Sequence, residues 1–260
     1  MARIEGTAIA MPKVVILGTA SFIPDETHEN THMLLQGESG SVLIDSGSNP
    51  LVSLKRAGLS ADPLQTMILT HFHPDHVSGV PNFLMGLWLM GRTRPLSIHG
   101  LNVTLDKIQA MMSLFEWRDW PGFYPVTFEP AQSIAGLTIL ETPDFHIQTA
   151  PTHHLVPSLA LKVTARPSGK TLVYSSDTSP CDSVAQLARG ADLLVHEVAG
   201  AASGHSSPAM AGAMARQAGV GRLALIHYHT YQDPQDLIAE AASTFYGPIT
   251  VLRDLDVIEL

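Results

Sequence analysis

The sequence predicts an α/β fold in which two mixed β-sheets pack face to face and helices cover their outer faces. The chain has 260 residues, of which 45% are hydrophobic, so it can bury a large core. Short apolar runs typical of strands alternate with longer helical segments along the chain. An order of several strands followed by helices occurs in both halves. Because no low-complexity linker separates the halves, we expect a single domain over residues 1–260.

The expected elements follow from local composition. Strands are expected where short β-branched and aliphatic runs are bounded by glycine, proline or polar residues. They cover residues 13–18, 33–36, 41–45, 66–70, 95–99, 137–141, 145–149, 157–164, 171–175, 192–196, 223–227 and 249–259. Helices are expected over residues 49–58, 80–91, 103–114, 182–189, 208–218 and 234–245. The glycines in 37–40 predict a hairpin turn, and the polar segment 19–32 predicts a loop.

Composition and charge narrow the class of protein. Fifteen Lys and Arg face 24 Asp and Glu, for a formal charge of −9, and the basic residues form no cluster. A long polyanion needs a positive face, so these numbers disfavour nucleic acid as a partner. The single cysteine, Cys181, fits a reducing cytoplasm. No apolar run is long enough to span a membrane, and the first 20 residues show no secretion signal.

The histidines carry the strongest functional signal. His71, His73, Asp75 and His76 lie within six residues, after an expected strand and before an expected helix. A turn there can bring these side chains to one point, whereas a continuing strand would divide them between two faces. Imidazole and carboxylate suit Zn²⁺, and an open coordination position lets the ion activate water. The alternative is a histidine-rich surface loop without function.

This cluster resembles the signature of the metallo-β-lactamase superfamily, whose fold is an αββα sandwich with a metal site at one edge. The likeness is closer to the ribonuclease Z branch and extends over nearly the whole chain. It is carried by the motif His71-x-His73-x-Asp75-His76 and by the order of the segments LGTAS at 17–21, LIDSG at 43–47, GVP at 79–81 and PLSIHG at 95–100.

The resemblance implies the remaining metal ligands. His154 matches a third motif; its neighbour His153 is the alternative, although a strand would point the two in opposite directions. Asp177 matches an aspartate that bridges two metals, and His227 matches the last ligand. The first ion would take His71, His73, His154 and Asp177, and the second Asp75, His76, Asp177 and His227. The resemblance thus implies a binuclear zinc hydrolase, with Mn²⁺ as the other possible metal, and a homodimer.

Two further motifs point to phosphodiester chemistry. His196-Glu197 and Gly204-His205-Ser206 resemble the "HEAT" and "HST" motifs of the phosphodiesterase branch, which are spaced more widely there. The resemblance implies that Glu197 orients His205, which then assists the leaving group. Asp75 would orient a metal-bridging hydroxide that attacks phosphorus. The alternative for His205 is that it only caps the helix beginning near Pro208.

Three departures from ribonuclease Z predict a small-molecule ester substrate, specifically a small phosphodiester. Only 22 residues separate His154 from Asp177, too few for the branch's tRNA-gripping arm, and the loop at 24–30 is acidic rather than basic. Net charge is the third departure. The alternatives are a tRNA 3′-processing endoribonuclease, an arylsulfatase or lactone hydrolase, and a metal-binding module without activity. The aromatic segment 115–124 is either a pocket wall or lid, or a packing or dimer contact.

Overall fold

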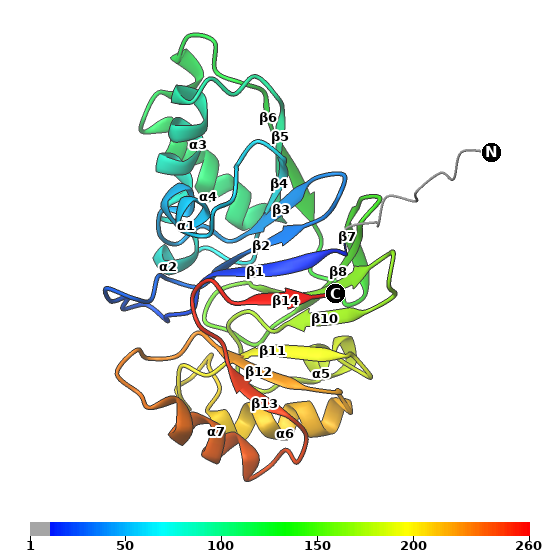
Figure 1. Ribbon diagram of the computed structural model, residues 1–260. Helices are drawn as coiled ribbons and strands as arrows, with labels where there is room; N and C mark the ends of the chain where they lie inside the picture. The colour runs from blue at the N-terminus through cyan, green and yellow to red at the C-terminus, as the bar shows by residue number, and fades with distance from the viewer. Residues whose placement is uncertain (1–10) are drawn as a thin grey trace, which may run out of the picture.

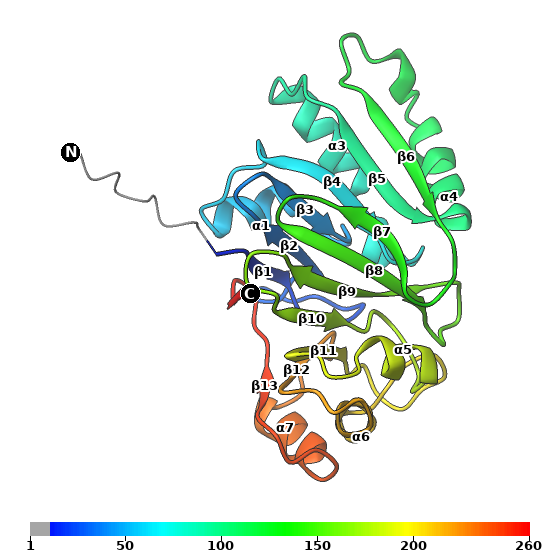
Figure 2. The same ribbon diagram turned by 90° about the vertical axis from the view of Figure 1, so that its right-hand side faces the viewer.

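A computed structural model describes residues 11–260. Residues 1–10 lie outside the described residues. They include the first half of the 20-residue segment in which we expect no secretion signal. The described chain forms two seven-stranded mixed sheets packed face to face, with helices on both outer faces (Figures 1 and 2). This arrangement confirms the predicted αββα sandwich.

The first sheet has the strand order β14-β1-β2-β3-β4-β5-β6. Its strands β14, β1, β2 and β3 pair antiparallel, whereas β3 to β6 pair parallel. The strands span Lys13–Gly18 (β1), His32–Gln36 (β2), Ser41–Ile44 (β3), Leu64–Leu69 (β4), Leu96–Leu101 (β5), Val126–Ala131 (β6) and Val257–Glu259 (β14). The helices α1 (Pro50–Arg56), α2 (Pro74–Val77), α3 (Val80–Leu89) and α4 (Asn102–Ser113) belong to this half.

The second sheet has the order β13-β12-β11-β10-β9-β8-β7. Here β7 to β10 pair antiparallel and β10 to β13 pair parallel. The strands span Leu137–Glu141 (β7), Phe145–Pro151 (β8), Leu159–Ala165 (β9), Thr171–Tyr174 (β10), Leu193–Glu197 (β11), Leu223–Ile226 (β12) and Ile249–Val251 (β13). The helices α5 (Asp182–Leu187), α6 (Pro208–Ala218) and α7 (Pro234–Ala242) belong to this half.

The hydrophobic core has three layers because strand side chains alternate between the two faces of a sheet. In β1, Val14 and Ile16 pack between the sheets, where they join Phe145 of β8. Val15 and Leu17 of the same strand face the opposite way and pack with the helices of the first half. A third cluster lies between the second sheet and α5, α6 and α7. Burial of these apolar side chains is the main force that holds the four layers together.

The structure differs from the predicted elements in four places. The helix α2 was not predicted, because its four residues are too few to show a helical period. The edge strand β6 was not predicted, because it is partly exposed and contains Pro130, which a central strand would not tolerate. Segment 115–124 contains a short 3-10 helix at Trp117–Asp119, and Trp117 is buried in the first half's helix-side core. The expected closing strands over 249–259 belong to different sheets, since β13 pairs with β12 and β14 with β1.

Loops that follow six strands, namely β1, β3, β4, β8, β10 and β12, meet at one edge of the sandwich. Main-chain bonds join them in pairs: the segment after β1 pairs with the segment after β12 through Ala20 and Tyr228. The segment after β3 bonds to the turn after β4, where the Ser46 N–H donates to the His76 carbonyl over 2.7 Å. Histidines and aspartates that follow these strands are therefore brought to the same region. Within residues 11–260, every helix is too short or too polar to pass through a bilayer.

Candidate active site

The turn after β4 places four side chains together. The chain leaves β4 at Leu69 and enters α2 at Pro74, whose fixed φ suits the first position of a helix. His73 precedes this helix in an extended conformation, while Asp75 lies in its first turn. The turn is held close to the neighbouring loop by Gly47, because a Cβ at that position would overlap the main-chain oxygen of Asp75. The short helix α2 thus mainly orients the side chains of Asp75 and His76.

Three other loops bring the remaining predicted residues to this turn. His154 follows β8, Asp177 follows β10, and His227 follows β12. His227 itself and Ser176, next to Asp177, have positive φ angles of 55° and 50°. Such backbone is uncommon for residues other than glycine and occurs at functional sites, where the surrounding structure holds it in place. His153, the alternative to His154, is exposed and lies outside the cluster.

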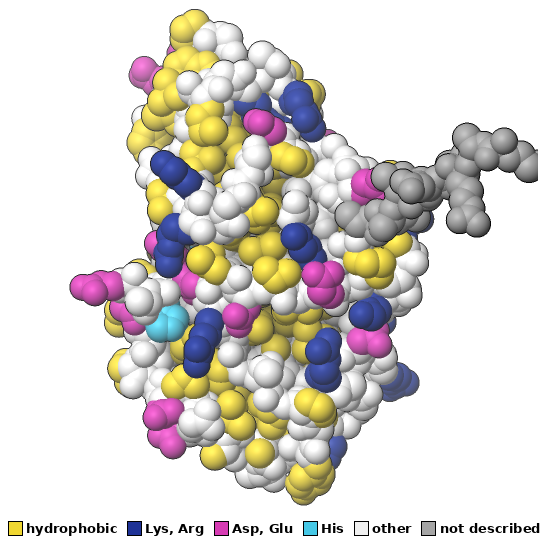
Figure 3. Space-filling view, viewed as in Figure 1, with side chains coloured by type: hydrophobic (Ala, Val, Ile, Leu, Met, Phe, Trp, Pro, Cys, Tyr) yellow, Lys and Arg dark blue, Asp and Glu magenta, His cyan; other side chains and the backbone are white. Residues whose placement is uncertain are grey.

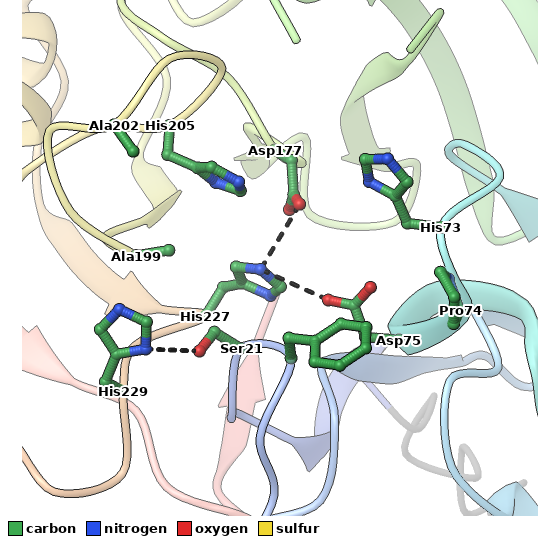
Figure 4. Close-up of a pocket in the computed structure, with 11 residues that line it drawn as sticks. Ser21, His73, Pro74, Asp75, Asp177, Ala199, Ala202, His205, His227 and His229 are labelled. Carbon is green, nitrogen blue, oxygen red and sulfur yellow. Dashed lines mark hydrogen bonds and ion pairs between the residues drawn. The ribbon is translucent and has the colours of Figure 1, made fainter. Parts of the chain in front are cut away.

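Four imidazoles surround the carboxylate of Asp177. His71 Nε2 lies 3.6 Å and His154 Nε2 lies 3.8 Å from Asp177 Oδ2. His227 Nε2 lies 3.4 Å from the same oxygen, a contact marked by a dashed line in Figure 4. His76 Nε2 lies 3.4 Å from Asp177 Oδ1. Asp75 Oδ2 lies 3.6 Å from His76 Nε2 and 3.8 Å from His227 Nε2. Residues from four separate segments of the chain thus converge on one point.

These atoms form two groups that share Asp177, with the ligand atoms of each group within 4.8 Å of one another. One group contains His71, His73, His154 and Asp177, and the other Asp75, His76, Asp177 and His227. Buried His71 Nε2, His76 Nε2 and Asp177 Oδ1 have no hydrogen-bond partner among residues 11–260. Leaving buried polar atoms without partners is costly, and atoms that all face one point satisfy one another best around a cation. The donor set fits divalent metal ions.

Burial and neighbouring charges set the protonation of the cluster. Burial opposes the charge on Asp177, but His227 and His76 beside it hold its pKa well below the usual range. Burial lowers the pKa of His71 far below normal and that of His227 to about 4, so both rings are neutral. Neutral imidazoles and ionised carboxylates are the forms that bind metals. His76 differs: burial opposes its charge, but Asp177 and Asp45 beside it raise its pKa well above the usual range, so a cation bound there must displace a proton.

Hydrogen bonds behind the cluster fix the ring orientations. The buried Asp45 carboxylate accepts hydrogen bonds from His76 Nδ1 at 2.9 Å and from the N–H of Thr70 at 2.8 Å. His154 Nδ1 donates to the Gly204 carbonyl over 2.7 Å, and His227 Nδ1 lies 3.1 Å from Thr31 Oγ1. These bonds leave each Nε2 directed at the cluster. Sequence reasoning placed Asp45 only in a resembling motif and gave no role to Thr31 or Gly204, because their loops meet the rings only in the folded chain.

His205 and Glu197 form a hydrogen-bonded pair beside the cluster. His205 Nδ1 lies 3.1 Å from Glu197 Oε1, and its ring lies over that of His227, with centroids 6.1 Å apart. Burial raises the pKa of Glu197 to about 7, and its hydrogen bond to His205 raises the pKa of that imidazole. Glu197 also accepts three main-chain N–H bonds, from Thr178, Ala199 and Ser206, which favour its ionised form. The shared proton therefore lies on His205.

His205 does not cap α6, which was the alternative reading of this residue. The cap is Ser207, whose hydroxyl accepts a hydrogen bond from the Met210 N–H at 3.3 Å. His205 instead lines a pocket of about 410 Å³ that also exposes His73, Asp75, Asp177 and His227. The pocket gives a ligand access to both the metal-type cluster and the Glu197–His205 pair.

Comparison with known proteins identifies the family. The model of the beta-lactamase superfamily domain matches residues 41–228. A ribonuclease Z of Mycobacterium bovis is 30% identical, with 96% of this chain and 99% of the relative covered. The chain belongs to the metallo-β-lactamase superfamily, in its ribonuclease Z-like branch. It is a metal-dependent hydrolase of that branch.

Two further proteins resemble this superfamily member over almost its whole length. A ribonuclease Z of Methanothermobacter thermautotrophicus is 28% identical over 96% of this chain and 97% of its own. The crystal structure of the metallo-beta-lactamase fold protein YhfI from Bacillus subtilis superposes with a TM-score of 0.83 at 26% identity, covering 96% of this chain and all of that one. The whole sandwich, and not only its metal-binding edge, is therefore shared with these proteins.

The predicted small-molecule ester partner is wrong. Relatives that match almost the entire chain are named as ribonucleases, which are enzymes of nucleic acid. The prediction relied on the short interval between His154 and Asp177, on the acidic loop at 24–30 and on net charge. Net charge sums over the whole surface and ignores the charge of any metal ions bound at the site itself. Lys and Arg side chains do lie scattered over the face seen in Figure 3. A nuclease that grips only a few nucleotides next to bound cations does not need a continuous basic face.

Proposed function

We propose that this protein is a ribonuclease that hydrolyses a phosphodiester bond of RNA with the help of two divalent metal ions. The observation that supports this most strongly is the shared Asp177 carboxylate, with four imidazole nitrogens 3.4–3.8 Å from its oxygens. The Glu197–His205 pair beside the cluster supplies a proton donor suited to an alkoxide leaving group. Together they would provide the activation of the attacking water and the protonation of the leaving group in phosphodiester hydrolysis.

In this proposal, each of the two groups of four residues holds one ion. Imidazole with carboxylate is a typical donor set for Zn²⁺, and Mn²⁺ is the second candidate. When bound, the ions would lower the pKa of water and stabilise negative charge on the phosphoryl oxygens. Asp177 belongs to both groups and would fix the spacing between them.

The chain's own residues would handle the protons. The Asp75 carboxylate lines the pocket and is placed to orient the attacking water. Protonated His205 is placed to donate a proton to the departing ribose oxygen, since its other ring nitrogen is held by Glu197. Buried Glu197 does not line the pocket and acts through His205, so it is a positioning residue. The homodimer and the cytoplasmic location stay predictions.

We expect Asp45→Asn to weaken metal binding about 10- to 100-fold, the usual cost of losing a carboxylate behind a histidine ligand. The change keeps the size of the side chain and its positive φ of 62°, which asparagine tolerates, but it replaces an acceptor of the His76 N–H. Competition with a chromogenic chelator measures the affinity. An unchanged affinity would show that Asp45 serves folding alone.

A substrate panel on one metal-loaded preparation tests the proposed function. We expect cleavage of a single-stranded oligoribonucleotide and of bis(p-nitrophenyl) phosphate, with little turnover of p-nitrophenyl sulfate or a lactone. Preferred turnover of the sulfate or the lactone would instead assign the site to an arylsulfatase or lactone hydrolase. Metal-loaded protein that turns over none of these compounds would leave only a metal-binding role.

A further inference from the structure

Part of the pocket lining is formed by residues other than the metal-type cluster and His205. This part includes Ser21 and Phe22, which follow β1, and His229, which follows β12. Ser21 and His229 are drawn side by side in Figure 4, where the Ser21 hydroxyl lies 3.0 Å from His229 Nδ1. We call Phe22 together with His229 the aromatic wall.

The two residues of the aromatic wall differ in exposure, because Phe22 is exposed and His229 is half-buried. Phe22 is 63% exposed although it lines the pocket. His229 is stacked on Tyr231 with ring centroids 5.3 Å apart and an interplanar angle of 6°, and Tyr231 is itself 82% exposed. Phenylalanine is usually buried, so an exposed phenyl ring at a pocket offers an apolar face to a ligand.

The backbone holds this wall firmly. Asn30 donates from Nδ2 to the carbonyls of both Ser21, at 2.7 Å, and Phe22, at 3.2 Å, and Asn30 is buried. On the other side, the Ser21 N–H donates to the carbonyl of Tyr228 over 3.0 Å. The segment that carries Phe22 is therefore hydrogen-bonded both to the loop after β12 and to the residues that lead into β2. A preorganised ring loses little conformational entropy when a planar ligand stacks on it.

We propose that the aromatic wall binds a nucleobase next to the scissile phosphodiester. A base has a flat apolar face that stacks on aromatic rings, and such stacking is sequence-tolerant. The Ser21 hydroxyl, oriented by His229, offers a polar contact for the ribose or for the base edge. This inference rests on the proposed function, because it names how the RNA would be held. It accounts for recognition of single-stranded RNA without a basic face.

Equilibrium binding tests the inference separately from turnover. A fluorescently labelled five-nucleotide RNA with hydrolysis-resistant phosphorothioate linkages is titrated with the metal-loaded protein and followed by anisotropy. We expect Phe22→Ala and His229→Ala each to raise the Kd roughly 5- to 100-fold, the range for loss of one base stack. An abasic oligomer of equal charge should bind the unaltered protein about as weakly. Phe115→Ala and Tyr246→Ala are matched controls, since these rings are 50% and 83% exposed outside the pocket, and should leave the Kd unchanged.

Each outcome decides the inference. Equal binding of the abasic and base-containing oligomers would overturn it, as would a Phe22→Ala protein that binds RNA as tightly as the unaltered one. Because the abasic arm uses the unaltered protein, a folding defect in a variant cannot mimic support. If the protein binds bases through the wall but cleaves no phosphodiester, the proposed function fails, and only the binding of a base by the wall stands. If it cleaves RNA but ignores the bases, only the inference fails.

Discussion

Asp177→Asn is expected to lower turnover on RNA at least about 100-fold and to release bound metal. The change removes one negative charge from a buried point that four imidazole nitrogens approach within 3.4–3.8 Å. Since Asp177 belongs to both groups of ligand atoms, its loss should exceed the 10- to 100-fold effect of a residue behind a ligand. Metal content after desalting and kcat on an oligoribonucleotide measure the two effects.

The control for Asp177→Asn is Asp106→Asn, which makes the same change of charge on an exposed position of α4. It should keep full metal content and full activity. If the Asp177 variant keeps both ions and near-normal turnover, Asp177 is not a ligand shared by two ions. The two groups of residues would then not be required for catalysis.

His205→Ala is expected to lower kcat on RNA about 10²- to 10⁴-fold without changing metal content, because it removes a general acid. The loss should be much smaller on bis(p-nitrophenyl) phosphate, whose p-nitrophenolate group departs without a proton. Glu197→Gln should show the same leaving-group pattern with a smaller loss, since Glu197 acts by holding His205 Nδ1. Steady-state kinetics on both substrates gives the comparison.

The leaving-group comparison separates this role from its alternatives. Equal losses on both phosphodiesters would mean that His205 stabilises charge or binds the phosphate rather than donating a proton. Loss of metal from the His205 variant would instead make it a ligand or a support of His154 and His227, against whose rings it packs.

Only part of the cluster could be predicted from local sequence features. His71 to His76 lie in one short segment, whereas His154, Asp177 and His227 were implied by the family resemblance. The apolar strands before Asp177 and His227 agree with a site at the sheet edge but would not have identified these two residues alone. The αββα layers followed from the alternation of short apolar runs and helices. Such features depend on neighbours in the sequence, which the chain alone displays.

Other features arise only when distant loops meet. Ser21 and His229 are 208 positions apart, and no motif in either segment predicts their hydrogen bond or the exposure of Phe22. The bond from Asp45 to His76 likewise depends on how the β3 loop packs against the β4 turn. Net charge misled the choice of substrate for a related reason, since a sum over the chain carries no information about where charges lie.

A titration of metal-free protein with Zn²⁺ or Mn²⁺ tests whether the two groups of residues bind two divalent ions that enable cleavage of RNA. Bound ions per chain and the rate of cleavage of a labelled oligoribonucleotide are followed together. We expect activity to rise with occupancy and to be complete at two ions per chain. Cleavage that is already complete in the metal-free protein, or two bound ions that bring no cleavage of RNA, would contradict this expectation.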